Sequence, residues 1–244
     1  MMDQSKIEEF EASILGRVIR PESKDYDEVR KIYNAMIDKR PRLIVECASV
    51  ADVMMAVRFG SDHGLDTAIR GGGHNGAGLA LVDDGMVIDL SNMKGIRVDP
   101  EAKTVRVEPG CRWKEVDHTT HAFGLATVSG VVANTGVSGL TLGGGHGFLT
   151  RQHGLTLDNL LSADVVLADG SLVHASEKEN QDLFWALRGG GGNFGVVTSL
   201  EFRLHPVDTI IGGPCSGPSN SSKLHCAGTA NGFPMPRKRC MPTL

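Results

Sequence analysis

A histidine stands within a glycine-rich stretch, RGGGHNGAG, at residues 70–78. An imidazole is a nucleophile near neutral pH, and glycine lets backbone N–H groups approach an anion closely. Gly71, Gly73 and Gly76 also satisfy the pattern G-x-G-x-x-G, which binds a dinucleotide where it opens a helix. The stretch predicts either a Rossmann loop or a different nucleotide site in which His74 has a chemical role.

The residues after this loop argue against the Rossmann alternative. Segment 79–90 consists of two short apolar runs joined by Asp84-Gly85, a pair typical of a β-hairpin. We therefore expect a hairpin here, and not the helix that an NAD-dependent Rossmann enzyme requires. A P-loop is excluded as well, because no glycine cluster ends in Gly-Lys-Ser or Gly-Lys-Thr.

Two further glycine clusters follow, GVSGLTLGGGHG at 136–147 and RGGGGNFG at 188–195. Together the clusters predict a concave surface of backbone N–H groups that fits a nucleotide diphosphate, to which Arg70 would add a charged donor. The alternative, that glycines only permit tight turns, stays open for any one cluster.

The elements that must position these loops change character along the chain. An apolar run at 41–48, a helix begun by Ser49 and a second strand at 65–71 predict a parallel βαβ unit. Asp52 stands at capping-box spacing from Ser49. Further on we expect hairpins at 95–110 and 163–176, helices at 111–124 and 180–190, and a closing strand at 196–206. Trp113 and Trp185 are expected to face the core from these helices, and the fold class is α+β.

The two ends of the chain differ from this middle part. Residues 1–37 are polar and read as helical or irregular, with Tyr26, Val29, Ile32, Tyr33 and Met36 at helical spacing. Residues 208–244 have no helical or strand period and hold three of the five cysteines. They predict an irregular tail, which is either disordered or the product of a shifted reading frame.

Bulk properties limit the partners. The 244 residues carry a formal net charge of −4, which gives no basic surface for nucleic acid. No signal peptide or membrane-spanning apolar stretch is visible, so we expect a cytoplasmic protein without membrane contact. The cysteines lack zinc-site spacing, and no metal site is predicted. Nothing in the sequence specifies the oligomeric state.

Several long motifs carry a family resemblance. RGGGHN, GVVANTGVSGLTLGGGHGFLTRQHGLTLDNLLSADVVLADG and DLFWALRGGGGNFGVVTSLEFRLHP stand in this order. They resemble the PCMH-type FAD-binding domain of the vanillyl-alcohol oxidase superfamily, and especially the berberine bridge enzyme-like oxidoreductases. The resemblance covers residues 38–207. It implies two α/β subdomains that enclose FAD.

The resemblance also implies roles for single residues. In this family the histidine that matches His74 bonds to the 8α-methyl group of the flavin, a reaction suited to a neutral imidazole. Val132 stands where some members have a cysteine that forms a second link, so a single link is predicted. The residues implied to bind FAD are Arg70, Gly71, Gly72, Gly73, His74, Asn75, Gly136, Ser138, Gly139, Gly143, Gly144, Gly147 and Val197.

Relatives of this kind are longer, and their substrate domain and catalytic base follow the strand that matches LEFRLHP. The chain therefore resembles one that is truncated at its C-terminus, and no residue can be assigned as the catalytic base. The resemblance implies an FAD-dependent oxidoreductase, or a fragment of one, that oxidises an alcohol, sugar or amine by hydride transfer. The alternative is an inactive FAD-domain remnant that at most binds nucleotide.

Overall fold

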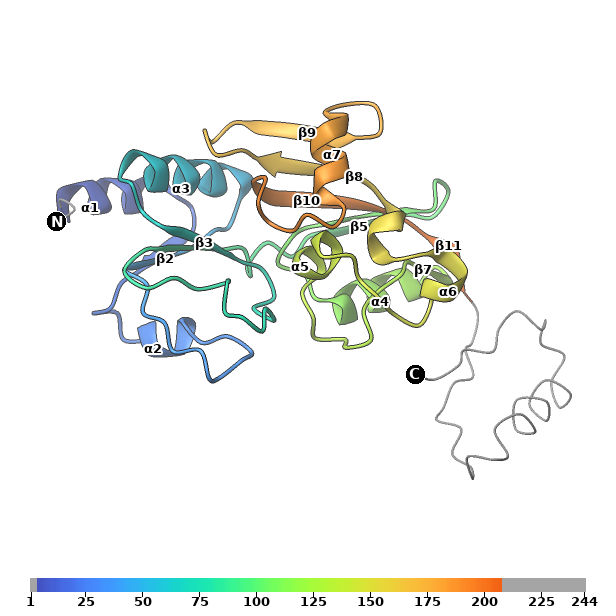
Figure 1. Cartoon of the computed structure of the whole chain (residues 1–244), viewed down its shortest axis with the longest axis horizontal. Helices are drawn as coiled ribbons and strands as arrows, with labels where there is room; N and C mark the ends of the chain where they lie inside the picture. The colour runs from blue at the N-terminus through green and yellow to red at the C-terminus, as the bar shows by residue number, and fades with distance from the viewer. Residues whose placement is uncertain (1–3, 208–244) are drawn as a thin grey trace, which may run out of the picture. The chain divides into compact units, whose positions relative to one another are not determined.

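The computed structural model describes residues 4–207, which contain two large β-sheets flanked by helices and one small two-stranded sheet (Figure 1). The first sheet has the strand order β1-β2-β4-β3, and the second has the order β5-β6-β10-β8-β9. This mixed architecture confirms the predicted α+β class. The predicted irregular tail at 208–244, with Cys215, Cys226 and Cys240, lies outside the described residues.

The first sheet is parallel except at one edge. Its strands are β1 (Arg17–Ile19), β2 (Leu43–Glu46), β4 (Met86–Asp89) and β3 (Thr67–Arg70), and only β1 runs antiparallel, against β2. The expected βαβ unit is confirmed, since β2, the helix α3 (Val50–Asp62) and β3 follow one another and both strands run parallel to β4. The segment 1–37 supplies β1, a strand that its polar composition did not predict.

The hairpin expected at Asp84-Gly85 is wrong. Residues 79–83 form no strand, and β4 runs between β2 and β3 as a parallel strand. All four β4 side chains are buried, because apolar residues cover both faces of this sheet. A hairpin would have left one face of β4 to solvent. The Rossmann reading still fails, since no helix begins in segment 71–85.

Both faces of the first sheet are covered by N-terminal elements. The helices α1 (Gln4–Ser13) and α3 pack on one face with Leu43, Val45, Met86 and Ile88. The helix α2 (Tyr26–Val29) lies on the opposite face (Figure 1). Of the two alternatives for residues 1–37, the helical one holds for α1 and α2 only, and residues 30–42 continue without a helix or strand.

The cap of α3 is only half of a capping box. Ser49 Oγ accepts a hydrogen bond from Asp52 N at 3.2 Å, as predicted. The Asp52 carboxylate does not return to Ser49 but accepts from the backbone N–H groups of Leu15, Gly16 and Ala48. The first turn of α3 is thereby tied to the connection between α1 and β1.

The second sheet is antiparallel throughout. Its strands are β5 (Ile96–Asp99), β6 (Thr104–Val107), β10 (Val196–Arg203), β8 (Leu160–Val166) and β9 (Leu172–Ser176). The hairpins predicted at 95–110 and 163–176 are confirmed as β5–β6 and β8–β9. The remaining elements are α4 (Trp113–His121), β7 (Leu125–Ala126), α5 (Val137–Leu142), α6 (Thr150–His153), the 3₁₀ turn η1 (Thr156–Asn159), α7 (Gln181–Leu187) and β11 (His205–Pro206).

The helices α4, α5 and α7 contribute to a second apolar core with the strands of this sheet. Trp113 is fully buried there, as expected. The expectation for Trp185 is wrong, since 74% of its surface is exposed while Phe184 and Leu187 turn inward. Phe184 and Leu187 are three positions apart and share one face of α7, whereas Trp185 lies about 100° from Phe184 around the helix and points away from that face.

Candidate functional site

The loop that contains His74 meets the loop before α5 backbone to backbone. The first loop, residues 71–78, follows β3, and the second, residues 129–136, ends at α5. A Cβ placed on Gly72 would lie 2.5 Å from both Cα and N of Gly136, and a Cβ on Gly136 would lie 2.6 Å from Gly72 N. Any side chain at either position would separate the loops, so the residues predicted as FAD ligands at Gly72 and Gly136 lie together.

The second loop is held in place by the start of α4. Trp113 N donates to Thr135 O at 3.1 Å, Lys114 N to Ala133 O at 2.9 Å, and Arg112 Nη1 to Asn134 O at 3.1 Å. The 133–135 carbonyl groups thus point toward α4. In contrast, no hydrogen bond within residues 4–207 uses the backbone N–H of Gly71, Gly72 or Gly73. Backbone N–H groups left in this way are suited to an anion such as a diphosphate.

The His74 ring lies flat against another aromatic ring. It stacks on Tyr33 with ring centroids 4.2 Å apart and an angle of 15° between the planes. Its Nε2 atom is buried and has no hydrogen-bond partner among the described residues. Burial lowers the pKa of His74, and the positive charge of Arg112 lowers it further, against a smaller opposite effect of the Asn134 backbone. Both effects favour the neutral form of the imidazole.

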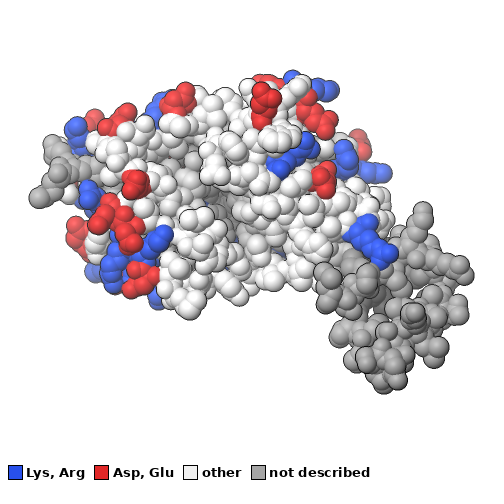
Figure 2. Space-filling view, in the orientation of Figure 1, with Lys and Arg blue, Asp and Glu red and all other residues white. Residues whose placement is uncertain are grey.

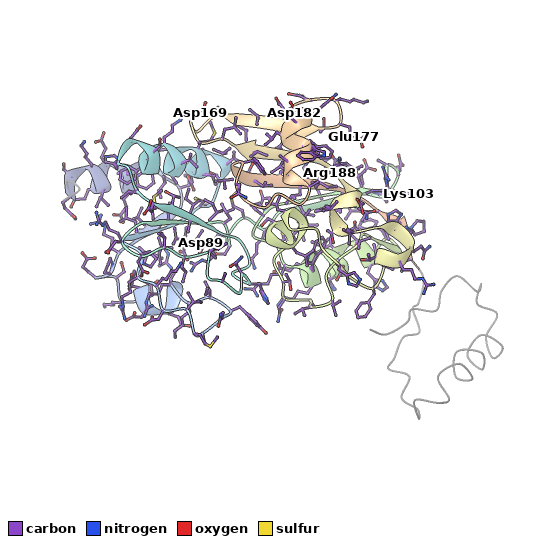
Figure 3. The ribbon with its side chains drawn as sticks, in the orientation of Figure 1. Asp89, Lys103, Asp169, Glu177, Asp182 and Arg188 are labelled. Atoms are coloured by element: carbon purple, nitrogen blue, oxygen red, sulfur yellow. The ribbon has the colours of Figure 1, made fainter. Side chains whose placement is uncertain are left out.

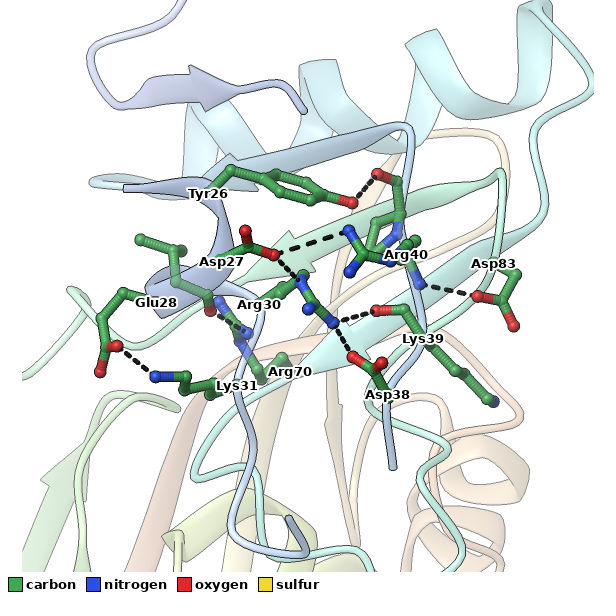
Figure 4. A network of polar contacts seen from close by, with 12 residues as sticks. Tyr26, Asp27, Glu28, Arg30, Lys31, Asp38, Lys39, Arg40, Arg70 and Asp83 are labelled. Atoms are coloured by element: carbon green, nitrogen blue, oxygen red, sulfur yellow. Dashed lines mark hydrogen bonds and ion pairs between the residues drawn. The ribbon is translucent and has the colours of Figure 1, made fainter. Parts of the chain in front are cut away.

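Arg70 has a structural partner. Its Nη2 lies 2.6 Å from Asp89 Oδ2, both side chains are buried, and its Nη1 donates to Val29 O at 2.7 Å. Asp89 lies among the strands of the first sheet in Figure 3, and Arg70 is drawn in Figure 4. Arg70 and Asp89 are register partners at the carboxyl ends of β3 and β4, so this ion pair fixes the point where the His74 loop begins.

The other predicted residues of the first loop shape its turns. Asn75 is exposed, and its Oδ1 accepts from Leu79 N at 3.1 Å. Gly71 lies beside Ser138, whose buried Oγ donates to Pro109 O at 3.1 Å. The hydroxyl of Ser138, in the first turn of α5 and beside the first loop, is thus hydrogen-bonded to the start of the β6–α4 connection.

The remaining predicted glycines lie along and after α5. Gly139 and Gly143 are exposed, whereas Gly144 and Gly147 are buried. Gly147 packs so closely on the Ser129 carbonyl that no Cβ would fit. Figure 2 shows that the middle of the viewed face carries mostly uncharged side chains, with Asp, Glu, Lys and Arg gathered toward its edges.

The third glycine cluster, residues 188–195, caps the C-terminal end of α5. Gly189 N and Gly191 N both donate to Leu142 O, at 3.1 and 3.0 Å, and so satisfy a carbonyl that the helix leaves unpaired. Val197 is a buried strand residue that pairs with Val165, so its side chain belongs to the core. A cofactor contact at Val197 would have to come from its backbone.

Some site residues had no signal in the sequence. Tyr33, Arg112 and Asn134 surround His74, yet they stand far from it along the chain, and no motif pairs them with it. Val132, at the position of the second flavin link in some relatives, is 54% exposed. Cys47 and Cys111 are buried, and burial raises the pKa of Cys111 to about 12.

Two kinds of feature are absent from residues 4–207. No three histidine, cysteine, aspartate or glutamate side chains gather there as a metal site would require. No helix in the same part of the chain has the length and apolar character needed to cross a membrane.

Comparison with known proteins places this site in a family. Residues 41–176 match the model of an FAD binding domain. The chain is 42% identical over 213 residues to the FAD-linked oxidoreductase pgmH of Aspergillus terreus, covering 86% of this chain and 43% of that protein. It thus spans less than half the length of this curated relative.

Solved structures agree. The crystal structure of 6-hydroxy-D-nicotine oxidase from Arthrobacter nicotinovorans superposes with a TM-score of 0.78 at 41% identity, over 80% of this chain and 43% of that one. Glucooligosaccharide oxidase from Acremonium strictum, described with a 6-S-cysteinyl, 8α-N1-histidyl FAD, gives 0.76 at 36% identity, over 81% and 42%. The chain belongs to the PCMH-type FAD-binding domain family of the berberine bridge enzyme-like, FAD-linked oxidoreductases.

Proposed function

We propose that residues 38–207 bind FAD for an oxidoreductase that oxidises an alcohol, sugar or amine, with the flavin linked to the chain through His74 alone. The observation that carries this proposal is the buried Nε2 of His74, which has no partner within the described chain. A buried polar atom without a partner costs about 1–3 kcal/mol, and a bound group that contacts it removes this cost.

The residues present fit FAD. Gly72 and Gly136 leave a narrow junction that any Cβ would fill, and the N–H groups of Gly71, Gly72 and Gly73 suit the diphosphate. We assign the FAD site to these glycines with His74 and Asn75, and to the α5 region through Ser138, Gly139, Gly143, Gly144 and Gly147. Arg70 would act by holding the loop, and Val197 through its backbone.

The chain would prepare one nitrogen for the covalent link. Burial and Arg112 favour the neutral imidazole, in which a nitrogen lone pair is available as a nucleophile. Bond formation exchanges the imidazole N–H and one C–H of the flavin 8α-methyl group for a C–N bond. Two protons would leave, and the two electrons would pass to an acceptor such as dioxygen. The flavin, when bound, supplies the hydride acceptor. Val132 offers no thiol, so a second link of the cysteinyl kind is not proposed.

The colour of the purified full chain tests the proposal. We expect a yellow protein whose colour stays with the polypeptide after acid precipitation. In His74→Ala the flavin should bind but be released by acid, while the circular dichroism spectrum stays unchanged. Acid-stable flavin in His74→Ala would refute the assignment of the link.

A second candidate is nucleotide binding without turnover, because no side chain among the described residues has been assigned as a catalytic base. It predicts bound flavin that stays oxidised when alcohols, sugars or amines are added without oxygen. Bleaching of the flavin by any of these substrate classes would exclude it. A protein that stays colourless after incubation with FAD would contradict both candidates.

A further inference from the structure

The His74 loop is covered by a segment far away in sequence, residues 29–39, which we call the N-terminal strap. The strap lies alongside the loop and is hydrogen-bonded to the loop and to the end of β3 at several points, beginning with Val29. Its hydrogen bonds to the β3 end and the following loop are Arg70 Nη1 to Val29 O at 2.7 Å, Tyr33 N to Gly73 O at 3.1 Å, Asn34 Nδ2 to Gly76 O at 2.9 Å, and Lys39 Nζ to Gly78 O and Leu81 O at 3.2 and 3.0 Å.

The strap is itself anchored at both ends. Tyr26 is buried, and its hydroxyl donates to Pro41 O at 2.7 Å. Arg30 contacts Asp27 and Asp38 and donates to Lys39 O, as Figure 4 shows. These contacts close the strap into a fixed arch, so its side chains have defined positions relative to the loop below.

One side chain of the strap contacts His74 directly. The Tyr33 ring lies 4.2 Å from the imidazole and is parallel to it within 15°. Yet 73% of the Tyr33 surface is exposed, so the tyrosine gains little from burial. The packing of the hydrophobic core therefore does not explain why an aromatic ring stands here.

We infer that Tyr33 is a positioning residue for His74: its ring fixes the plane of the imidazole and thereby the direction in which Nε2 faces the flavin. The inference rests on the proposed function and adds a residue to it. Rotation about the Cβ–Cγ bond of a histidine has broad minima, so an unsupported ring samples many planes. A stacked ring allows only those planes that keep the contact, and the backbone bond from Tyr33 N to Gly73 O holds the two residues together.

The charge state of His74 offers a readout that does not depend on flavin. Three effects act on the pKa of His74: its own burial, the positive charge of Arg112 at the start of α4, and the Asn134 backbone in the second loop. Because the Tyr33 ring covers one face of the imidazole, its removal exposes that face to water. The pKa of His74 should then rise toward the ordinary histidine value.

The experiment compares Tyr33→Ala, Tyr33→Phe and the matched control Met36→Ala in the full chain. Met36 belongs to the same strap and is 87% exposed. Two quantities are measured: the pKa of His74 in flavin-free protein, by NMR with the His74→Ala spectrum for assignment, and the rate at which added FAD becomes acid-stable. Tyr33→Ala should raise the pKa and slow attachment about three- to tenfold, the effect of losing one aromatic pair.

Tyr33→Phe keeps the ring and should match the unchanged protein in both measurements, as should Met36→Ala. The inference is overturned if Tyr33→Ala changes neither quantity, or if Tyr33→Phe behaves like Tyr33→Ala. Should the unchanged protein never form acid-stable flavin, the proposed link fails, whereas the pKa measurement still decides whether Tyr33 holds the imidazole.

Discussion

At the scale of single residues, the site depends on two glycines, whose lack of a Cβ atom lets their backbones meet. Gly72 and Gly136 touch through their backbones, and this contact brings the His74 loop against the loop that α4 holds. These two glycines belong to the site because their backbones approach each other closely. A glycine in the sequence could equally have indicated a turn.

An alanine at the junction should therefore be costly. In Gly72→Ala the added Cβ meets Gly136 backbone, which cannot move as a flexible side chain would, so we expect a loss of about 1–3 kcal/mol in the free energy of unfolding and weaker FAD retention. Gly192→Ala is the matched control, since a Cβ there meets no atom within 4 Å and the residue lies outside the assigned FAD site. Urea denaturation of both variants checks the prediction, and equal stabilities would contradict it.

At the scale of elements, α4 carries a carboxyl group that the site does not use. Asp117 accepts from Ser129 Oγ at 3.4 Å, near the start of the second loop. Burial raises the pKa of Asp117 to about 6, against a smaller lowering by Ser129. The folded protein therefore holds this proton over a pH range in which the unfolded chain has lost it, so stability falls as pH rises from about 4 to 6.

Removing the negative charge of Asp117 should remove the loss of stability that accompanies its ionisation. Asp117→Asn is expected to gain about 1–2 kcal/mol of stability relative to the unchanged protein at pH 7, a value reduced for partial solvent screening, and to gain nothing at pH 3. Thermal unfolding at both pH values measures the difference. A gain of the same size at pH 3 would show that the effect does not come from ionisation.

At the scale of the whole molecule, FAD would bridge a loop that follows the first sheet and a loop that leads into α5, a helix in the core of the second sheet. The apolar core beside the first sheet includes Val166 and Val196 of the second, so the two halves of residues 4–206 share one packed core. A ligand that contacts both loops stabilises the folded chain by linkage, because the unfolded chain has no such site.

Stabilisation by nucleotide should accordingly be selective. FAD at a hundred times its Kd should add about 2.7 kcal/mol to the free energy of unfolding, whereas NAD at the same concentration should add almost nothing. Denaturant unfolding with each nucleotide tests this, in the His74→Ala variant so that binding stays reversible. Equal stabilisation by NAD would revive the dinucleotide reading that the lack of a helix after Gly78 excludes.

Local structural features could be predicted from the sequence, because they depend on residues that are neighbours along the chain. The Ser49 cap, the hairpins β5–β6 and β8–β9, and the family motifs are local patterns, and all are confirmed. Only the tertiary structure decided the parallel place of β4, the exposure of Trp185, the Arg70–Asp89 pair and the Tyr33–His74 stack. Each of these features depends on contacts with residues that are far away in the sequence. Periodicity cannot predict such contacts, because it describes only how residues alternate within one element.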